Sequence, residues 1–324
     1  MSAIIPKPGI GSDISAAIHS ELSLCYTCSS CVAECPVNRF TNRLQPLKYV
    51  RMAGLGMAEE LLRSPEIWYC LSCNRCTNIC PMTVKPAGLL SFLRKEAVRR
   101  GYVRKGTAPE IAETQKRLHK VRYHAAALVK EGQKAADIAL DRLADAPAPV
   151  WTDQGQLAYP SVEAKRFRKA FSGFLGRQTT LASCLTCCEC TNSCPVARER
   201  SFFDPMRIVR MAVFGLHELL KSPSIWLCLE CQTCTSACGQ LVRGHMVLRR
   251  AQELAIEGGF VNGTFQENWQ EVQKRIFAEY IGNIDTILDA GCLAGSNLRA
   301  GEPTYETFHE KPIWGSADSR HGPA

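Results

Sequence analysis

The chain has 324 residues, 18 of them cysteines, and a formal net charge of +8. A hydrophobic content of 46% is enough to bury a core, which excludes a disordered or fibrous protein. No apolar run approaches the roughly 18 residues of a membrane span, and the N-terminus lacks the basic start and apolar core of a secretory signal. We therefore expect a cytoplasmic protein, in a reducing compartment where many cysteines indicate metal ligands rather than disulfides.

Sixteen of the cysteines fall into four copies of one spacing, Cys-x-x-Cys-x-x-Cys-x-x-x-Cys. The copies begin at Cys25, Cys70, Cys184 and Cys228, and proline follows the last cysteine in all but the fourth, where Gly239 stands. This spacing is the ligand run of ferredoxin-type 4Fe–4S clusters. Structural zinc, the alternative, uses two separated cysteine pairs per ion, often with histidine, and none of the seven histidines shares the repeat. The spacing predicts four 4Fe–4S clusters.

We expect paired motifs to exchange their fourth ligands. Three closely spaced cysteines wrap one corner of a cubic cluster, while the fourth is carried away and, in two-cluster ferredoxins, binds the cluster of the partner motif. The four predicted ligand sets are Cys25, Cys28, Cys31 and Cys80; Cys70, Cys73, Cys76 and Cys35; Cys184, Cys187, Cys190 and Cys238; and Cys228, Cys231, Cys234 and Cys194. Two cysteines remain. We expect Cys188 to be an inert neighbour of the ligands and Cys292 to be a small buried residue.

The two halves of the chain are copies of each other. Segment 60–71 matches 218–229, and the shift between the halves falls from 159 to 158 residues along the chain. After Pro46 and Pro205, apolar residues recur every three or four positions, which predicts helices between the motifs that end at Ser64 and Ser222. Long helices are also predicted over about 108–144 and 265–290, whereas strand patterns are scarce.

The predicted fold is all-α, with two tandem α-helical ferredoxin-like domains of two clusters each. The predicted limits are a first domain over 1–145, a linker over 146–165, a second domain over 166–300 and an irregular tail over 301–324. Trp68 and Trp226, two residues before the first cysteine of each second motif, either shield a cluster from water or simply pack in the core.

The cysteine motif, the following helix and the Ser-Pro-x-Ile-Trp-x-Cys run together resemble the iron–sulfur C subunit of heterodisulfide reductase. The resemblance covers about 20–105 and again about 180–263. It implies an all-helical electron conduit whose partners are the flavin-bearing A subunit and the cysteine-rich catalytic B subunit of that family. The chain departs from the family in fusing two copies. Gly239 also replaces a proline, which frees an N–H that can shift the potential of a nearby cluster.

The sequence carries no Cys-Cys-Gly motif, dinucleotide fingerprint, phosphate loop or nucleophile elbow. We therefore expect an electron-transfer subunit without a substrate site of its own. Two alternatives stay open: the iron–sulfur subunit of a quinone-linked oxidoreductase of the succinate or fumarate type, and a non-enzymatic iron–sulfur sensor. Peripheral association with a membrane is compatible with the sequence. Sixteen ligand thiolates, about −16, and four oxidised cluster cores of about +2 each would offset the charge of +8, which argues against nucleic acid as a partner.

Overall fold

A computed structural model describes residues 8–149, 162–175 and 181–291. Every regular element in these residues is a helix, which confirms the all-α prediction. The predicted tail and Cys292 lie outside the described residues, as does most of the predicted linker. In the described part of the chain, no helix combines the length and the apolar composition needed to cross a membrane.

The first copy forms a lobe of short helices, called here the first lobe. Its elements are α1 (Pro8–Ala17), η1 (Leu22–Leu24), α2 (Ser30–Ala33), α3 (Pro36–Thr41), α4 (Pro46–Gly54), α5 (Ala58–Arg63), η2 (Pro65–Tyr69), α6 (Arg75–Asn78) and α7 (Pro86–Arg99). The long helix α8 (Thr107–Lys130), η3 (Ala135–Asp137) and α9 (Leu140–Leu143) follow.

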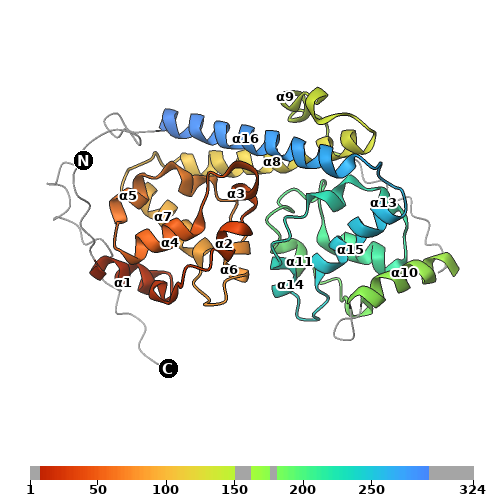
Figure 1. The fold of residues 1–324 in the computed structure, drawn as a ribbon, viewed down its shortest axis with the longest axis horizontal. Coiled ribbons are helices and arrows are strands. Elements are labelled where there is room, and N and C mark those ends of the chain that lie inside the picture. The colour runs from red at the N-terminus through yellow and green to blue at the C-terminus, as the bar shows by residue number, and fades with distance from the viewer. Residues whose placement is uncertain (1–7, 150–161, 176–180, 292–324) are drawn as a thin grey trace.

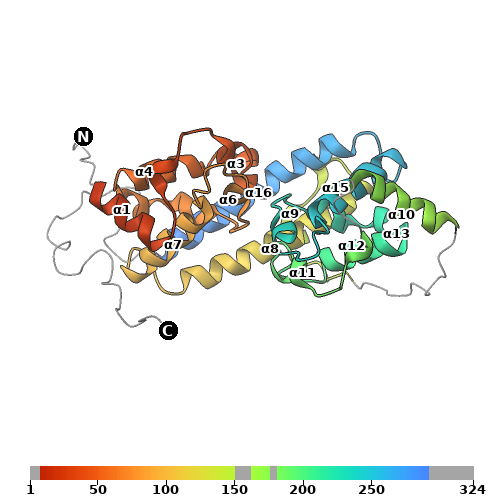
Figure 2. The ribbon, with the colours of Figure 1, turned by 90° about the horizontal axis from the view of Figure 1, so that it is seen from below.

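The second copy repeats this order in a second lobe, except that no described helix corresponds to α3. Its elements are α10 (Val162–Leu175), η4 (Leu181–Ser183), α11 (Glu189–Asn192), α12 (Pro205–Phe214), α13 (Glu218–Lys221), η5 (Pro223–Leu227), α14 (Thr233–Ser236) and α15 (Gly244–Glu257), and the long helix α16 (Phe265–Gly291) ends the described chain. The lobes lie side by side along the long axis, and α8 and α16 run across both (Figures 1 and 2).

In the first copy, two of the predicted helices are shorter than expected. The stretch predicted to be helical after Pro205 in the second copy also breaks, into α12 and α13 at Gly215. The stretch after Pro46 breaks into α4 and α5 because the backbone takes a positive φ of 73° at Gly56. The helix predicted over 108–144 ends at Lys130, just before Gly132, where φ is 94°. Glycine adopts this left-handed conformation readily, so these breaks have a local cause. The helix predicted over 265–290 is confirmed by α16.

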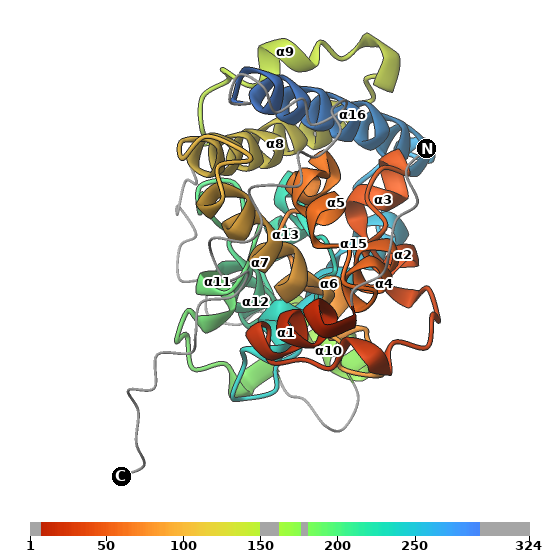
Figure 3. The same ribbon diagram turned by 90° about the vertical axis from the view of Figure 1, so that its left-hand side faces the viewer.

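Helices α8 and α16 form an antiparallel pair that joins the lobes (Figure 3). The Gln115 side-chain NH₂ lies 3.5 Å from the Tyr280 hydroxyl, and the Arg122 Nε donates to the Gln273 side-chain oxygen at 3.0 Å. With the 158-residue shift, Gln115 corresponds to Gln273 and Arg122 to Tyr280, so the two contacts are symmetry mates. Each long helix also packs on the other lobe, α8 on η5 and α16 on α3 and η2.

Gly215, at the end of α12, has a φ of 74°. A β-carbon there would come within 2.4 Å of the Ala164 carbonyl oxygen in α10. We expect Gly215→Ala to lower the free energy of unfolding by at least about 1–2 kcal/mol, the cost of a left-handed alanine alone. Denaturant unfolding measures this loss. Gly263→Ala is the control because its β-carbon meets nothing within 4 Å, and equal losses in both variants would contradict the argument.

Candidate iron–sulfur sites

All four cysteine motifs fold as the same tight loop. The residues before and after each second cysteine have positive φ, and these pairs are Thr27 (63°) and Ser29 (61°), Ser72 (55°) and Asn74 (58°), Thr186 (55°) and Cys188 (64°), and Glu230 (51°) and Gln232 (64°). Turns of this kind make concave arrays of backbone N–H groups that hold anions at many Fe–S sites. The Ser72 and Glu230 N–H groups donate to the Sγ atoms of Cys70 and Cys228, both at 3.3 Å. The loops therefore fit an anionic, sulfur-ligated group.

One cavity lies within the first lobe. Its four cysteines come from both motifs of the lobe: Cys25, Cys28 and Cys31 from the first motif, and Cys80 from the second. The charges of the other three thiolates help to raise the pKa of Cys31 to about 11, after burial, which is the larger cause. The cavity thus gathers the first predicted ligand set, with the fourth cysteine crossing from the partner motif.

Two further cavities gather predicted sets in the same crossed way. One is lined by Cys35 with Cys70, Cys73 and Cys76. Its counterpart in the second lobe is lined by Cys194 with Cys228, Cys231 and Cys234. We call these two the inner sets, and the sets that begin at Cys25 and Cys184 the outer sets. In both lobes, the last cysteine of the earlier motif lines the cavity of the later motif.

The outer set of the second lobe is described by fewer contacts. The Cys184 charge helps to raise the pKa of Cys190 to about 11, although burial is the larger cause. The Cys238 Sγ accepts from the Val242 N–H at 3.5 Å. The Cys188 thiol instead donates to the Thr186 carbonyl oxygen at 3.7 Å. Cys188 occupies the left-handed position that Ser29 holds in the first motif. Its place beside the ligands rather than among them stays a prediction.

Burial raises the pKa values of six thiols in the inner sets. It raises the pKa of Cys35, Cys194 and Cys234 to about 12 in each case, and it raises the pKa values of Cys73, Cys76 and Cys228 still further. Without metal these thiols stay protonated at neutral pH. Ligation to iron replaces the protons, so cluster assembly releases protons and depends on pH.

The outer loops, by contrast, carry exposed thiols. The Ser30 hydroxyl beside Cys28 lowers the pKa of that exposed thiol. Cys187, at the equivalent position of the second lobe, is also exposed. Large apolar side chains stand next to these thiols in the open, with Tyr26 58% exposed and Leu185 66% exposed. The outer loops therefore combine accessible sulfur with apolar surface.

The inner loops meet where the lobes face each other, at α6 and α14 (Figure 1). The Asn78 side-chain NH₂ donates to the Cys231 carbonyl oxygen at 2.8 Å, and the Thr233 hydroxyl donates to the Cys73 carbonyl oxygen at 3.2 Å. Arg75 forms an ion pair with Glu34 of its own lobe and another with Glu230 across the boundary, at 3.6 Å. These contacts hold the two inner cysteine sets against each other.

A buried cation stands beside the inner set of the second lobe. Arg122 is 3% exposed and donates to the Leu227 carbonyl oxygen at 2.9 Å, next to Cys228. Within the described residues it forms no ion pair with a carboxylate. Burial lowers its pKa to about 10, so the guanidinium stays charged at neutral pH. At the equivalent place in the first lobe, the neutral Tyr280 hydroxyl donates to the Tyr69 carbonyl oxygen at 3.2 Å.

Sequence reasoning missed Arg122, although a signal was available. The internal alignment pairs this arginine with a tyrosine inside an otherwise similar stretch, Glu113–Arg117 against Glu271–Arg275. Trp68 and Trp226 are 1% and 7% exposed and pack in the main core. Each indole N–H lacks a hydrogen-bond partner among the described residues. Core packing is thus observed for both tryptophans, and shielding of a cluster stays a prediction.

Comparison with known proteins matches each lobe separately. The model of the 4Fe–4S dicluster domain matches residues 21–84 and again 180–242. The C subunit of the H₂:CoB-CoM heterodisulfide, ferredoxin reductase of Methanothermobacter thermautotrophicus is 31% identical over 90 residues, which cover 28% of this chain and 48% of the relative. The iron–sulfur C subunit of the CoB–CoM heterodisulfide reductase of Methanopyrus kandleri is 35% identical over 81 residues, which cover 25% and 42%.

The chain is similar to the C subunits of heterodisulfide reductases and carries the 4Fe–4S dicluster domain twice. A C-subunit-like protein of Archaeoglobus profundus is 36% identical over 74 residues, which cover 23% of this chain and 39% of the relative. The matches span less than half the length of these three relatives. The resemblance predicted from the cysteine motifs is therefore confirmed, as is the tandem duplication of the C-subunit-like domain.

Proposed function

We propose that this C-subunit-like protein is an electron-transfer subunit with four 4Fe–4S clusters, held by the four crossed cysteine sets. The observation that carries the proposal is the gathering of three sets, each around its own cavity. The domain limits 1–145 and 166–300 belong to the same proposal. Helices α8 and α16 each contact both lobes, so they join the two domains. A bound 4Fe–4S cluster exchanges single electrons without moving substrate.

The chain's own residues supply insulation, spacing and charge. Each inner cavity is lined mainly by buried side chains of its own lobe, such as Val37 in the first and Phe203 in the second, which keeps water from the sulfur ligands and strengthens nearby electrostatic interactions. The bonds from Asn78 and Thr233 to cysteine carbonyls fix the distance between the two inner loops. We infer a path that enters at one exposed outer loop, crosses the lobe boundary through the inner loops and leaves at the other outer loop.

The relatives are named as subunits of heterodisulfide reductase complexes. We propose by analogy that this chain acts in such a complex, in the cytoplasm, between a donor protein like the flavin-bearing A subunit and a catalytic protein like the cysteine-rich B subunit. The exposed side chains of Tyr26 and Leu185 at the two outer loops suit the docking of protein partners. Purification of the native complex under anaerobic conditions tests this part, and recovery of the chain alone would contradict it.

Metal analysis tests the cluster proposal directly. Anaerobically purified protein should contain about 16 iron atoms and as many sulfides per chain, four for each set. Iron near eight per chain would mean that one lobe is empty, and zinc in place of iron would refute the proposal. Electron paramagnetic resonance of the reduced protein should show interacting clusters, because the inner loops of the two lobes are in contact.

A further inference from the structure

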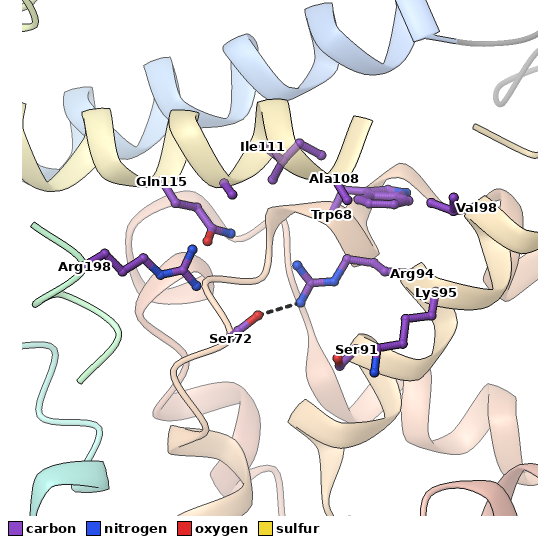
Figure 4. Close-up of a pocket in the computed structure, with 11 residues that line it drawn as sticks. Trp68, Ser72, Ser91, Arg94, Lys95, Val98, Ala108, Ile111, Gln115 and Arg198 are labelled. Carbon is purple, nitrogen blue, oxygen red and sulfur yellow. Dashed lines mark hydrogen bonds between the residues drawn. The ribbon is translucent and has the colours of Figure 1, made fainter. Parts of the chain in front are cut away.

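A cavity of about 450 Å³ lies outside the cysteine sets, between α7 and α8 of the first lobe (Figure 4). Its polar side chains include Arg94 and Lys95 from α7 and Gln115 from α8. Arg198 reaches it from the second lobe, in the loop that follows α11. The volume falls within the range of small-molecule sites, about 300–1,000 Å³.

The cavity has a cationic side and an apolar side. Trp68, Val98 and Ile111 form an apolar wall, and no aspartate or glutamate among the described residues lines the cavity. Arg94 is already engaged, since it donates to the Cys70 carbonyl oxygen at 3.2 Å and to the Ser72 hydroxyl at 2.9 Å. Within the described residues, the side chains of Lys95 and Arg198 form no hydrogen bond and no ion pair. Their donors therefore remain available to an anion.

The equivalent place in the second lobe is built differently. The 158-residue shift puts Gln252 in the place of Arg94, Glu253 in the place of Lys95 and Trp269 in the place of Ile111. Glu253 forms an ion pair with Arg250 at 3.1 Å, and Gln252 donates to the Ile225 carbonyl oxygen at 2.7 Å. The second lobe thus neutralises and partly fills the space that the first lobe leaves open and positive.

Aromatic packing adds to this difference. Phe265, which replaces Thr107, lies against Trp226 with ring centroids 4.4 Å apart, and its ring stacks with Trp269 at 6.3 Å. The two lobes share a fold and an ancestry, so the fold alone does not require an open, cationic cavity at this place. The difference is confined to side chains, as expected for a binding site that one copy has and the other lacks.

We propose that this cavity binds a small organic anion, with a phosphate, sulfonate or carboxylate head between Lys95 and Arg198 and an apolar body against Trp68 and Ile111. Arginine and lysine donate charge-assisted hydrogen bonds to such heads. The Cys70 carbonyl oxygen also accepts from Gln115, at 3.1 Å, so the anion lies beside the backbone of a predicted ligand loop. A small molecule suits the partly enclosed volume and the apolar wall.

Phenyl phosphate is the probe, titrated calorimetrically into the anaerobic holoprotein. We expect one site per chain, with weaker binding of inorganic phosphate, which lacks the apolar body, and of phenol, which lacks the charge. Arg198→Gln and Lys95→Glu change exposed side chains and should each weaken binding at least about tenfold.

Arg39→Gln is the matched control, because Arg39 is the counterpart of Arg198 in the first lobe, at a shift of 159, and does not line this cavity. Its affinity for phenyl phosphate should stay within about twofold of that of the parent. Absence of binding, equal loss in Arg39→Gln and Arg198→Gln, or equal affinity for phenol and phenyl phosphate would overturn the proposal.

Discussion

Replacing Cys80 with serine should remove the cluster of the first motif, which Cys25, Cys28 and Cys31 help to hold, and spare the cluster of the motif to which Cys80 itself belongs. These four cysteines line one cavity, whereas Cys70, Cys73 and Cys76 line another with Cys35. Serine is a poor substitute for a thiolate, so we expect about four irons to be lost, from about 16 to about 12 per chain. Iron analysis measures the loss.

Double variants test which cysteines hold the same cluster. Adding Cys28→Ser to Cys80→Ser should cost no further iron, because both cysteines serve the same cluster, while adding Cys73→Ser should lower the count to about eight. Cys188→Ser is the matched control and should keep full iron, since that thiol bonds to the Thr186 carbonyl oxygen. If Cys80→Ser and Cys73→Ser removed the same four irons, the crossed ligation would be wrong.

Replacing Arg122 with glutamine should lower the midpoint potential of the cluster at Cys228, Cys231, Cys234 and Cys194. Arg122 is a buried cation next to Cys228, and a cation favours the reduced, more negative cluster. At an effective dielectric constant of about 20, a unit charge within about 10 Å of the cluster contributes on the order of 2 kcal/mol. That energy corresponds to a shift of roughly 80 mV for one electron. A redox titration followed by electron paramagnetic resonance measures it.

The controls separate charge from packing. Arg122→Lys keeps the charge and should keep most of the potential, even if both variants lose stability. Tyr280→Phe removes the equivalent hydroxyl donor in the first lobe but no charge, and should change the potentials little. The signal that shifts in Arg122→Gln should be the one that is absent in Cys234→Ser. Equal shifts in the glutamine and lysine variants would show that charge is not the cause.

Much of the fold follows from the sequence because cysteine spacing and internal repetition are local signals. The motifs that begin at Cys25 and Cys184 predict cluster loops without reference to the rest of the chain, and the match of 60–71 with 218–229 predicts two equivalent lobes. Proline at 46 and 205 marks the start of a helix in each lobe, as the structure shows for α4 and α12. The crossed ligand sets remain a prediction that the variants above will test.

The arrangement of the two lobes relative to each other could not be predicted from the sequence. An amphipathic pattern tells which face of a helix is buried but not against which neighbour, so nothing in 107–130 indicates that α8 packs on η5 of the other lobe. The contact of Arg122 with Leu227 joins residues 105 positions apart, and Arg198 reaches its cavity from the second lobe. Such long-range contacts depend on the whole tertiary arrangement. A glycine at position 56 is a local signal for a helix break, but the sequence alone does not show that its φ is positive.

The paired contacts of α8 and α16 obey the rule of an isologous dimer, in which residue i of one protomer meets residue j of the other and j meets i. In a true homodimer every substitution occurs twice, so a buried arginine on one side would require a second arginine on the other. Covalent fusion removes that requirement. One chain can carry Arg122 at one end of the pair and Tyr280 at the other. The clusters of two identical halves would have equal reduction potentials. The clusters of two diverged halves can differ in potential, which gives electron transfer between them a favoured direction.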